Sequence, residues 1–282
     1  MNGNRIYGNR MHRKKLLYCL FTALLVQHAG WSQSLQETQA VIPMTSTAYK
    51  RTGVSTTALA LLPAAAEFKA QKSIAVAAEN RFMVKELSRL YVALALSQKN
   101  HATKFGGSFQ GSAIYAQYHL NAGYALQLNR QLQAGLQLGW NAVRLKGNKP
   151  SMQVTTSGGV VLFIQEKVGW GIHLKTATPI GQTVHAANGH QEITTGMGFI
   201  LSESIYLSAE LAANSSNKLS SNMALRWMLG EQISLQGGIS HPMSMLFFNL
   251  GWKRKNELLS VGISSHDRLG LSGMIVLDYA LD

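Results

Sequence analysis

Hydrophobic residues recur at every second position through much of this chain, and that period is typical of β-strands. In residues 131–140, leucine, alanine and tryptophan occupy the even positions, while glutamine and glycine occupy the odd ones. The same alternation recurs in residues 204–211, 222–229, 232–240 and 259–264. A helix would mix the two sets of residues on one face, so we expect an all-β chain.

The polar faces of these segments carry almost no charge. They are built from glutamine, serine, asparagine and glycine, and only 14% of the chain is charged while 46% is hydrophobic. Strands that face bulk water usually carry lysine, glutamate and threonine, whereas small neutral residues suit a confined interior. The sequence therefore favours an antiparallel transmembrane β-barrel, with a secreted β-sandwich as the alternative. Six aromatic residues on the apolar faces fit an interfacial girdle: Tyr118, Tyr124, Trp140, Trp227, Trp252 and Tyr279.

The barrel is expected to span residues 73–282 and to contain about 14 strands, with twelve as the alternative. Each strand with its connection then averages about 15 residues, which suits tilted membrane strands. An even strand number puts both ends of the barrel on the periplasmic side, and the longest external loop is expected at residues 178–190. The expected strands are 73–82, 87–98, 102–109, 113–128, 131–145, 152–164, 168–177, 191–201, 204–213, 219–229, 232–240, 244–253, 257–265 and 270–280.

Residues 1–32 are interpreted as a secretory signal peptide. Five basic residues and no acidic ones accompany an apolar run at residues 16–26, and Gly30-Trp31-Ser32 forms a small-x-small cleavage pattern. The run is too short to span a bilayer as a helix. Translation starts at Met1 or at Met11. The only cysteine, Cys19, lies inside this leader, so the exported chain is expected to hold no disulfide and no cysteine-based metal or redox site.

The segment 33–72 alternates poorly and stays open to two interpretations. Residues 57–68 are rich in alanine and leucine and predict a short helix broken at Pro63. The segment is either a small plug in the barrel mouth, or a periplasmic tail or additional edge strand.

Two stretches of the chain resemble a known family. The run Glu-Asn-Arg-Phe-Met-Val-Lys-Glu-Leu at residues 79–87, followed by the strand that ends at residues 93–96, resembles the opening of the PorV/PorQ group of outer-membrane proteins. Residues 238–242, 247–251 and 264–272 look like the closing hairpins of that group. The group is related to the FadL long-chain fatty-acid transporter. The resemblance implies a FadL-like barrel of fourteen strands. The members of the PorV/PorQ group include accessory proteins of type IX secretion.

No motif of a soluble enzyme is present, and no cofactor or metal is expected. The candidate ligand-contacting residues are charged residues expected to point into the lumen, where buried charges need partners: Glu79, Arg81, Glu210, Arg226 and Asp278. An alternative catalytic pair, Ser264 and His266, lies two residues apart on one strand face with Asp267 adjacent. Such a pair predicts an outer-leaflet lipid hydrolase. The resemblance instead implies that His266 is a hairpin residue.

The sequence favours a protein of the cell outer membrane that is not an enzyme. We expect passive transport of a small hydrophobic ligand or of a membrane component. The alternative is a partner-binding barrel of a type IX-like secretion or surface-attachment system. The expected partners are outer-membrane lipid and lipopolysaccharide. A secretion-system protein or a hydrophobic small molecule is the expected further partner. The formal net charge is +13, but the basic residues after the leader are scattered singly, so nucleic acid is not expected.

Overall fold

The computed structural model describes residues 71–164, 167–180, 190–216, 218–241 and 245–281, together with Pro63, Ala64 and Phe68. The predicted signal peptide and most of the segment 33–72 lie outside the described residues. The described elements are fourteen strands and two short 3-10 turns: β1 (Gln71–Asn80), η2 (Arg81–Met83), η3 (Lys85–Leu87), β2 (Ser88–Ser97), β3 (His101–Gly111), β4 (Tyr115–Gln127), β5 (Leu132–Leu145), β6 (Ser151–Ile164), β7 (Val168–Ile180), β8 (His190–Ile200), β9 (Ile205–Asn214), β10 (Leu219–Leu229), β11 (Ile233–His241), β12 (Met245–Arg254), β13 (Glu257–His266) and β14 (Gly270–Leu281).

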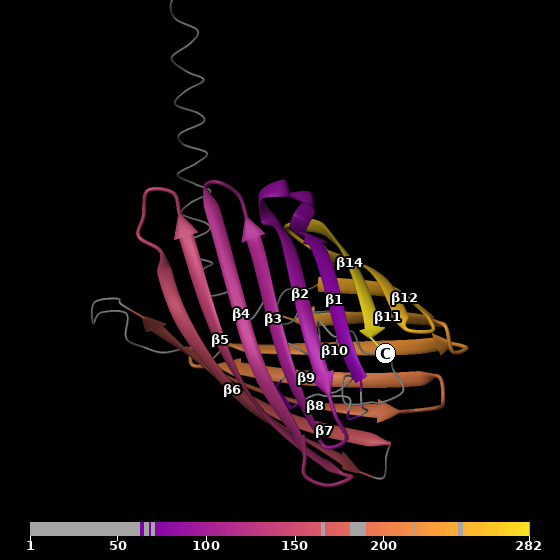
Figure 1. The fold of residues 1–282 in the computed structure, drawn as a ribbon. Helices are drawn as coiled ribbons and strands as arrows, with labels where there is room; N and C mark the ends of the chain where they lie inside the picture. Colours follow the sequence, from indigo (N-terminus) through magenta and orange to yellow (C-terminus); the bar gives the residue numbers. More distant parts are fainter. Residues whose placement is uncertain are drawn as a thin grey trace, which may run out of the picture. The chain divides into compact units, whose positions relative to one another are not determined.

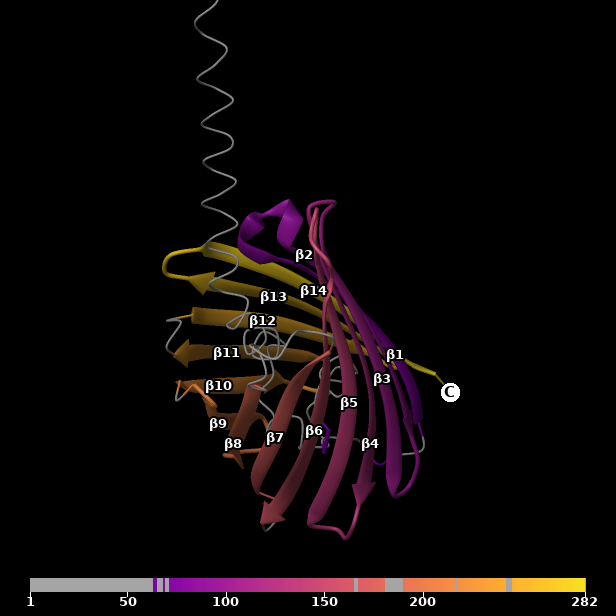
Figure 2. The ribbon, with the colours of Figure 1, turned by 90° about the vertical axis from the view of Figure 1, so that its left-hand side faces the viewer.

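The fourteen strands form one closed antiparallel barrel. Each strand pairs with its neighbours in sequence, and β1 closes the barrel by pairing with β14 through a register that sets Ala75 opposite Asp278. The predicted fourteen-strand barrel is confirmed, and the twelve-strand alternative is wrong. Figures 1 and 2 show the wall of β1–β6 facing the wall of β9–β13, with the strands of the two walls running at a large angle, as tilted barrel strands do.

Two ends of the barrel are distinguished below. The terminal end is where β1 begins and β14 finishes, and the distal end is where η2 and η3 connect β1 to β2. Among the described residues, no helix is long and apolar enough to cross a membrane.

Two predicted boundaries are wrong in an informative way. The loop expected at residues 178–190 is shorter, because β7 continues to Ile180 by pairing with β6, and β8 already begins at His190. Beyond Ala177, β7 has no β8 partner among the described residues, and a strand edge of this kind tolerates Pro179. The first strand begins at Gln71, not residue 73, and finishes at Asn80, so Arg81 and Phe82 lie in η2 and not in a strand.

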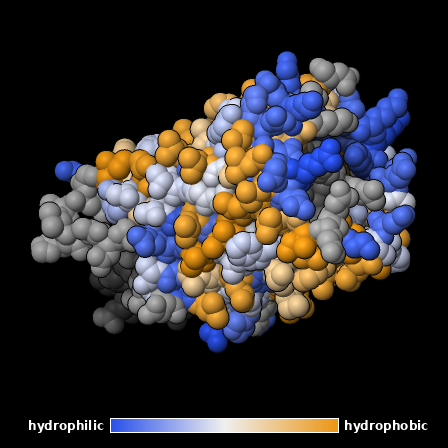
Figure 3. Space-filling view, turned by 90° about the horizontal axis from the view of Figure 1, so that it is seen from below, coloured by the Kyte–Doolittle hydropathy of each residue, from blue (hydrophilic) through white to orange (hydrophobic). Residues whose placement is uncertain are grey.

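The outer face of the barrel is apolar on every strand. At least one large hydrophobic side chain is exposed on each of the fourteen strands, for example Leu138 on β5, Leu225 on β10 and Val261 on β13. Figure 3 shows apolar side chains gathered across the middle of the face in view, with hydrophilic side chains collected towards one side. An apolar surface of this extent is that of a protein that meets lipid or a partner and not bulk water.

The inner face is polar and buried. Alternate residues of the same strands carry amide, hydroxyl and charged groups, such as Gln133 and Gln137 on β5 and Gln236 on β11. The two faces follow from the period of two, because neighbouring side chains of a strand point to opposite sides of the wall. The predicted distribution of polar and apolar residues between the two faces is therefore confirmed.

Candidate functional site: charged groups on the inner wall

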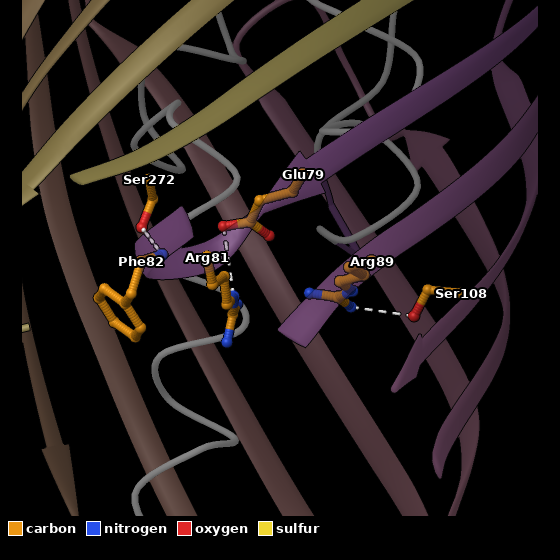
Figure 4. A network of polar contacts seen from close by, with 6 residues as sticks. All are labelled: Glu79, Arg81, Phe82, Arg89, Ser108 and Ser272. Atoms are coloured by element: carbon orange, nitrogen blue, oxygen red, sulfur yellow. Dashed lines mark hydrogen bonds and ion pairs between the residues drawn. The ribbon is translucent and has the colours of Figure 1, made fainter. Parts of the chain in front are cut away.

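Three charged residues meet at the distal end of the barrel. The Nε atom of Arg81 lies 3.3 Å from Oε1 of Glu79, and both side chains are largely buried. Arg89 on β2 lies directly opposite Glu79 in the β1–β2 register, and its Nη2 donates to Oγ of Ser108 at 3.0 Å. Figure 4 shows the Glu79 and Arg81 side chains directed toward each other and Arg89 reaching Ser108. We call Glu79, Arg81 and Arg89 the distal cluster; it carries one negative and two positive charges.

The backbone of η2 places Arg81 beside Glu79. Phe82 and Met83 have φ values of 55° and 54°, a backbone conformation that residues other than glycine rarely adopt. The N–H of Phe82 donates to Oγ of Ser272 on β14 at 3.0 Å, and its ring packs edge-on against His266. These two contacts join the turn to β14 and β13, and Arg81 is buried beside Glu79.

The distal cluster has unused hydrogen-bonding capacity. No described group accepts a hydrogen bond from Nη2 of Arg81, although this atom is buried. The hydroxyl of Tyr115, at the start of β4, donates to Oε1 of Gln117 at 2.9 Å and lies within electrostatic reach of both Arg81 and Arg89. The cluster thus has a positive excess beside neutral polar groups.

The other three predicted lumen residues also lie on the inner wall, but away from the distal cluster. Glu210 on β9, Arg226 on β10 and Asp278 on β14 are all buried. Glu210 is paired with Asn222, whereas Arg226 is paired with Tyr206, so the two are offset by four positions along the β9–β10 ladder. The structure therefore brings Glu79 and Arg81 together and leaves the other three predicted residues at separate places on the wall.

The alternative catalytic pair lies on the inner face of β13 at the distal end. The backbone N–H of Arg268 donates to Nδ1 of His266 at 3.1 Å, which requires Nδ1 to be unprotonated. In neutral imidazole the proton then sits on Nε2, and a ring in that form has no free nitrogen to accept a proton from Ser264. This hydrogen bond lies at the turn between β13 and β14 and disfavours Ser264 and His266 as a catalytic pair.

Two features of the inner wall were absent from the sequence-based candidates. Lys104 on β3 is 1% exposed, and its Nζ donates to the carbonyl oxygen of Pro63 at 3.1 Å. Pro63 itself is fully buried, and a Cβ at Gly135 on β5 would overlap the same carbonyl oxygen. The alternation of residues 102–110 does place Lys104 inward, but no periodic signal connects it to Pro63.

Two more residues of the segment 33–72 contact the inner wall. Ala64 packs with Val161 and with the partly buried Phe163 of β6. Phe68 packs against Ala102 and Ala125, which belong to β3 and β4. With Pro63, these residues contact the walls of β3 to β6.

In the part of the chain that the structure describes, no group of three or more histidine, cysteine, aspartate or glutamate residues is arranged to hold a metal ion. Apart from the distal cluster, the described polar groups of the inner wall are dispersed amides, hydroxyls and single charges. Such an arrangement can orient a passing or bound solute by hydrogen bonds and charge.

Comparison with known proteins relates this chain to others by structure alone. No family model matches the sequence, and no curated protein matches it. The outer membrane protein Omp33 of Acinetobacter baumannii superposes with a TM-score of 0.52 at 7% identity, covering 76% of this chain and 99% of that one. The TodX deltaS2S3 mutant, a monoaromatic hydrocarbon channel, gives a TM-score of 0.50 at 8% identity, covering 74% and 88%. The P. putida toluene transporter TodX gives 0.49 at 8% identity, covering 81% and 92%. The likeness to Omp33 and to the TodX mutant shows the fold alone, which is that of an outer-membrane β-barrel.

Proposed function

We propose that this protein is a passive channel of the cell outer membrane. The observation that supports this most directly is the polar, hydrogen-bonding inner wall within an apolar outer wall. A barrel that served only as a membrane anchor could fill its interior with apolar side chains, whereas a polar interior suits a solute path. The likeness to the TodX mutant channel supports the same proposal at the level of fold.

We further propose that the solute is a small hydrophobic ligand or part of a membrane component. Ala77, Tyr91, Ala93 and Val276 form a buried cluster on β1, β2 and β14, and Met274 packs against it. The inner wall is therefore not polar throughout, and the presence of this apolar cluster supports a solute with an apolar part.

The channel is tested with the full chain, purified and reconstituted into planar bilayers and vesicles. We expect stepwise ionic currents and faster entry of an apolar fluorescent probe, phenylnaphthylamine, into vesicles that contain the barrel. A folded barrel, identified by its heat-dependent gel shift, that gives neither result would overturn the proposal. A stoichiometric protein partner that co-purifies in mild detergent would instead support the secretion-accessory role implied by the PorV/PorQ resemblance.

We further propose that the segment 33–72 acts as a plug. Gln71 and Lys72 begin β1, but the described residues before them, Pro63, Ala64 and Phe68, all contact the inner wall, which supports a plug over a tail or an edge strand. The Lys104–Pro63 hydrogen bond is buried, and a hydrogen bond between an amine and a carbonyl contributes about 0.5–1.5 kcal/mol net. The missing Cβ of Gly135 leaves the space that Pro63 occupies.

Replacing Lys104 by methionine removes the hydrogen bond to Pro63 and keeps a side chain of similar volume. We expect this change to weaken the attachment of the plug to the inner wall. Since 1.4 kcal/mol corresponds to a factor of ten in an equilibrium, the displaced plug should become up to about tenfold more populated. Two quantities are measured: the rate of trypsin cleavage at Lys69 in the folded barrel in vesicles, and the mean open time of single channels. Lys146→Met, in the exposed turn after β5, is the matched control and should leave both unchanged. Gly135→Ala should act in the same direction as Lys104→Met, and wild-type cleavage and open times in both variants would contradict the plug.

A further inference from the structure

Arg226 is a buried cation on the inner wall without a described carboxylate partner. It is 7% exposed and lies on the inner face of β10, between the outward-facing Leu225 and Trp227. Its Nη2 atom is hydrogen-bonded to Oγ of Ser234 at 3.4 Å. The Nε and Nη1 atoms are buried and have no hydrogen-bond acceptor among the described residues.

The surroundings of Arg226 on the neighbouring strands are neutral and polar. Tyr206 lies opposite Arg226 on β9 and Gln236 lies opposite it on β11. The inward acid on the adjoining strand, Glu210, is four positions along the ladder, roughly 13 Å away at the usual rise of a strand. Opposite Arg226, the described residues of β9 and β11 therefore supply hydroxyl and amide groups and no negative charge.

The contact that orients Arg226 depends on a glycine. A Cβ at Gly251 on β12 would overlap Oγ of Ser234, so the absence of a side chain there gives the serine its position beside Arg226. The guanidinium is thus held at Nη2, whereas its buried Nε and Nη1 donors have no acceptor among the described residues. An unpaired buried charge costs several kcal/mol, and this cost is offset when an anion binds.

We propose that Arg226 is the cation of an oxyanion-binding site on the inner wall, which takes the carboxylate or phosphate group of a solute in the channel. The inference rests on the proposed channel and adds a class of solute to it. Guanidinium groups suit both anions because their planar donors match two oxygens at once. The distal cluster, with two guanidinium groups and one carboxylate, adds positive potential at the distal end of the same lumen.

Anion binding is measured on the full chain in detergent micelles, independently of any current. Sodium phosphate and sodium acetate are titrated against sodium chloride at constant ionic strength and pH, and the unfolding temperature is followed by the gel shift. We expect a saturable rise in unfolding temperature with phosphate or acetate in the wild type, and an apparent Kd at least about tenfold weaker in Arg226→Gln. A response to phosphate alone assigns a phosphate group, and a response to both assigns any oxyanion.

Two variants keep the test decisive. Arg144→Gln removes the same charge from the exposed outer face of β5 and should bind the anions as the wild type does. Ser234→Ala keeps the charge of Arg226 but removes its anchor, and should weaken binding even if Arg226→Gln does not fold. Without added anion, Arg226→Gln should be no less stable than the wild type, since it removes an unpaired buried charge.

Different results would overturn the anion site and the channel. A wild type that conducts ions but shows no oxyanion response, or an equal response in Arg226→Gln, overturns the anion site and leaves the channel standing. A wild type that binds oxyanions through Arg226 but passes no current and no probe supports the site and overturns the channel.

Discussion

Replacing Leu138 by lysine is expected to lower the free energy of unfolding by about 2–4 kcal/mol. Leu138 lies midway along β5 on the outer face, with 62% of its side chain exposed. If that face meets the hydrocarbon core of a bilayer, a lysine ammonium there loses its hydration, and the cost is largest at the midplane. The measurement is urea unfolding of the barrel refolded into phospholipid vesicles.

The same substitution separates a membrane barrel from a water-soluble one. On a soluble protein, an exposed leucine replaced by lysine changes stability by about 0.5 kcal/mol or less. Ser265→Lys is the matched control, because Ser265 is exposed near the distal end of β13, where the cost of a charge falls to about 0–1 kcal/mol. Equal stabilities for Leu138→Lys, Ser265→Lys and wild type would mean that the outer wall does not face lipid.

The arrangement of the strands was predictable because it depends on local information. The alternation of residues 131–140 fixes which side chains of β5 point inward, and the turns between alternating runs fix the number of strands. The neutral character of the inward residues indicates a confined interior without any knowledge of strand pairing. Errors are confined to strand ends, where a ladder continues or stops for reasons that lie on the partner strand, as at Pro179 opposite Gln153.

The candidate site was less predictable because its contacts join distant parts of the chain. Glu79 and Arg81 were expected together from their spacing of two, and they do form an ion pair, although through a turn and not along a strand. Arg89 was not singled out, since its position opposite Glu79 depends on the β1–β2 register. The contact between Lys104 and Pro63 spans 41 residues and involves a backbone carbonyl, which no side-chain pattern reveals.

The charges that the sequence did reveal differ in their surroundings. Glu79 has guanidinium groups beside and opposite it, whereas Arg226 has only neutral partners on the described wall. A stability measurement and a binding measurement therefore test different residues: the first suits the paired charge, and the second suits the unpaired one.

Replacing Glu79 by glutamine is expected to destabilise the barrel by about 3 kcal/mol. The change keeps the size of the side chain but removes the one negative charge of the distal cluster, which leaves the buried Arg81 beside Arg89 with no compensating carboxylate. Loss of one partner of a buried pair is costly because the desolvated charge that stays behind is uncompensated. The midpoint of urea unfolding in phospholipid vesicles measures the loss.

The physical cause is isolated by removing the second charge as well. In Glu79→Gln/Arg81→Met, no unpaired guanidinium remains at this position, and we expect most of the lost stability to return, since replacing a whole buried pair is often close to neutral. Glu86→Gln makes the same chemical change at an exposed position in η3 and should alter stability by no more than about 0.5 kcal/mol. A Glu79→Gln barrel as stable as the wild type would show that lumen water solvates Arg81 as well as the carboxylate does. The distal cluster would then be a hydrated group at the entrance of the channel and not a structural ion pair.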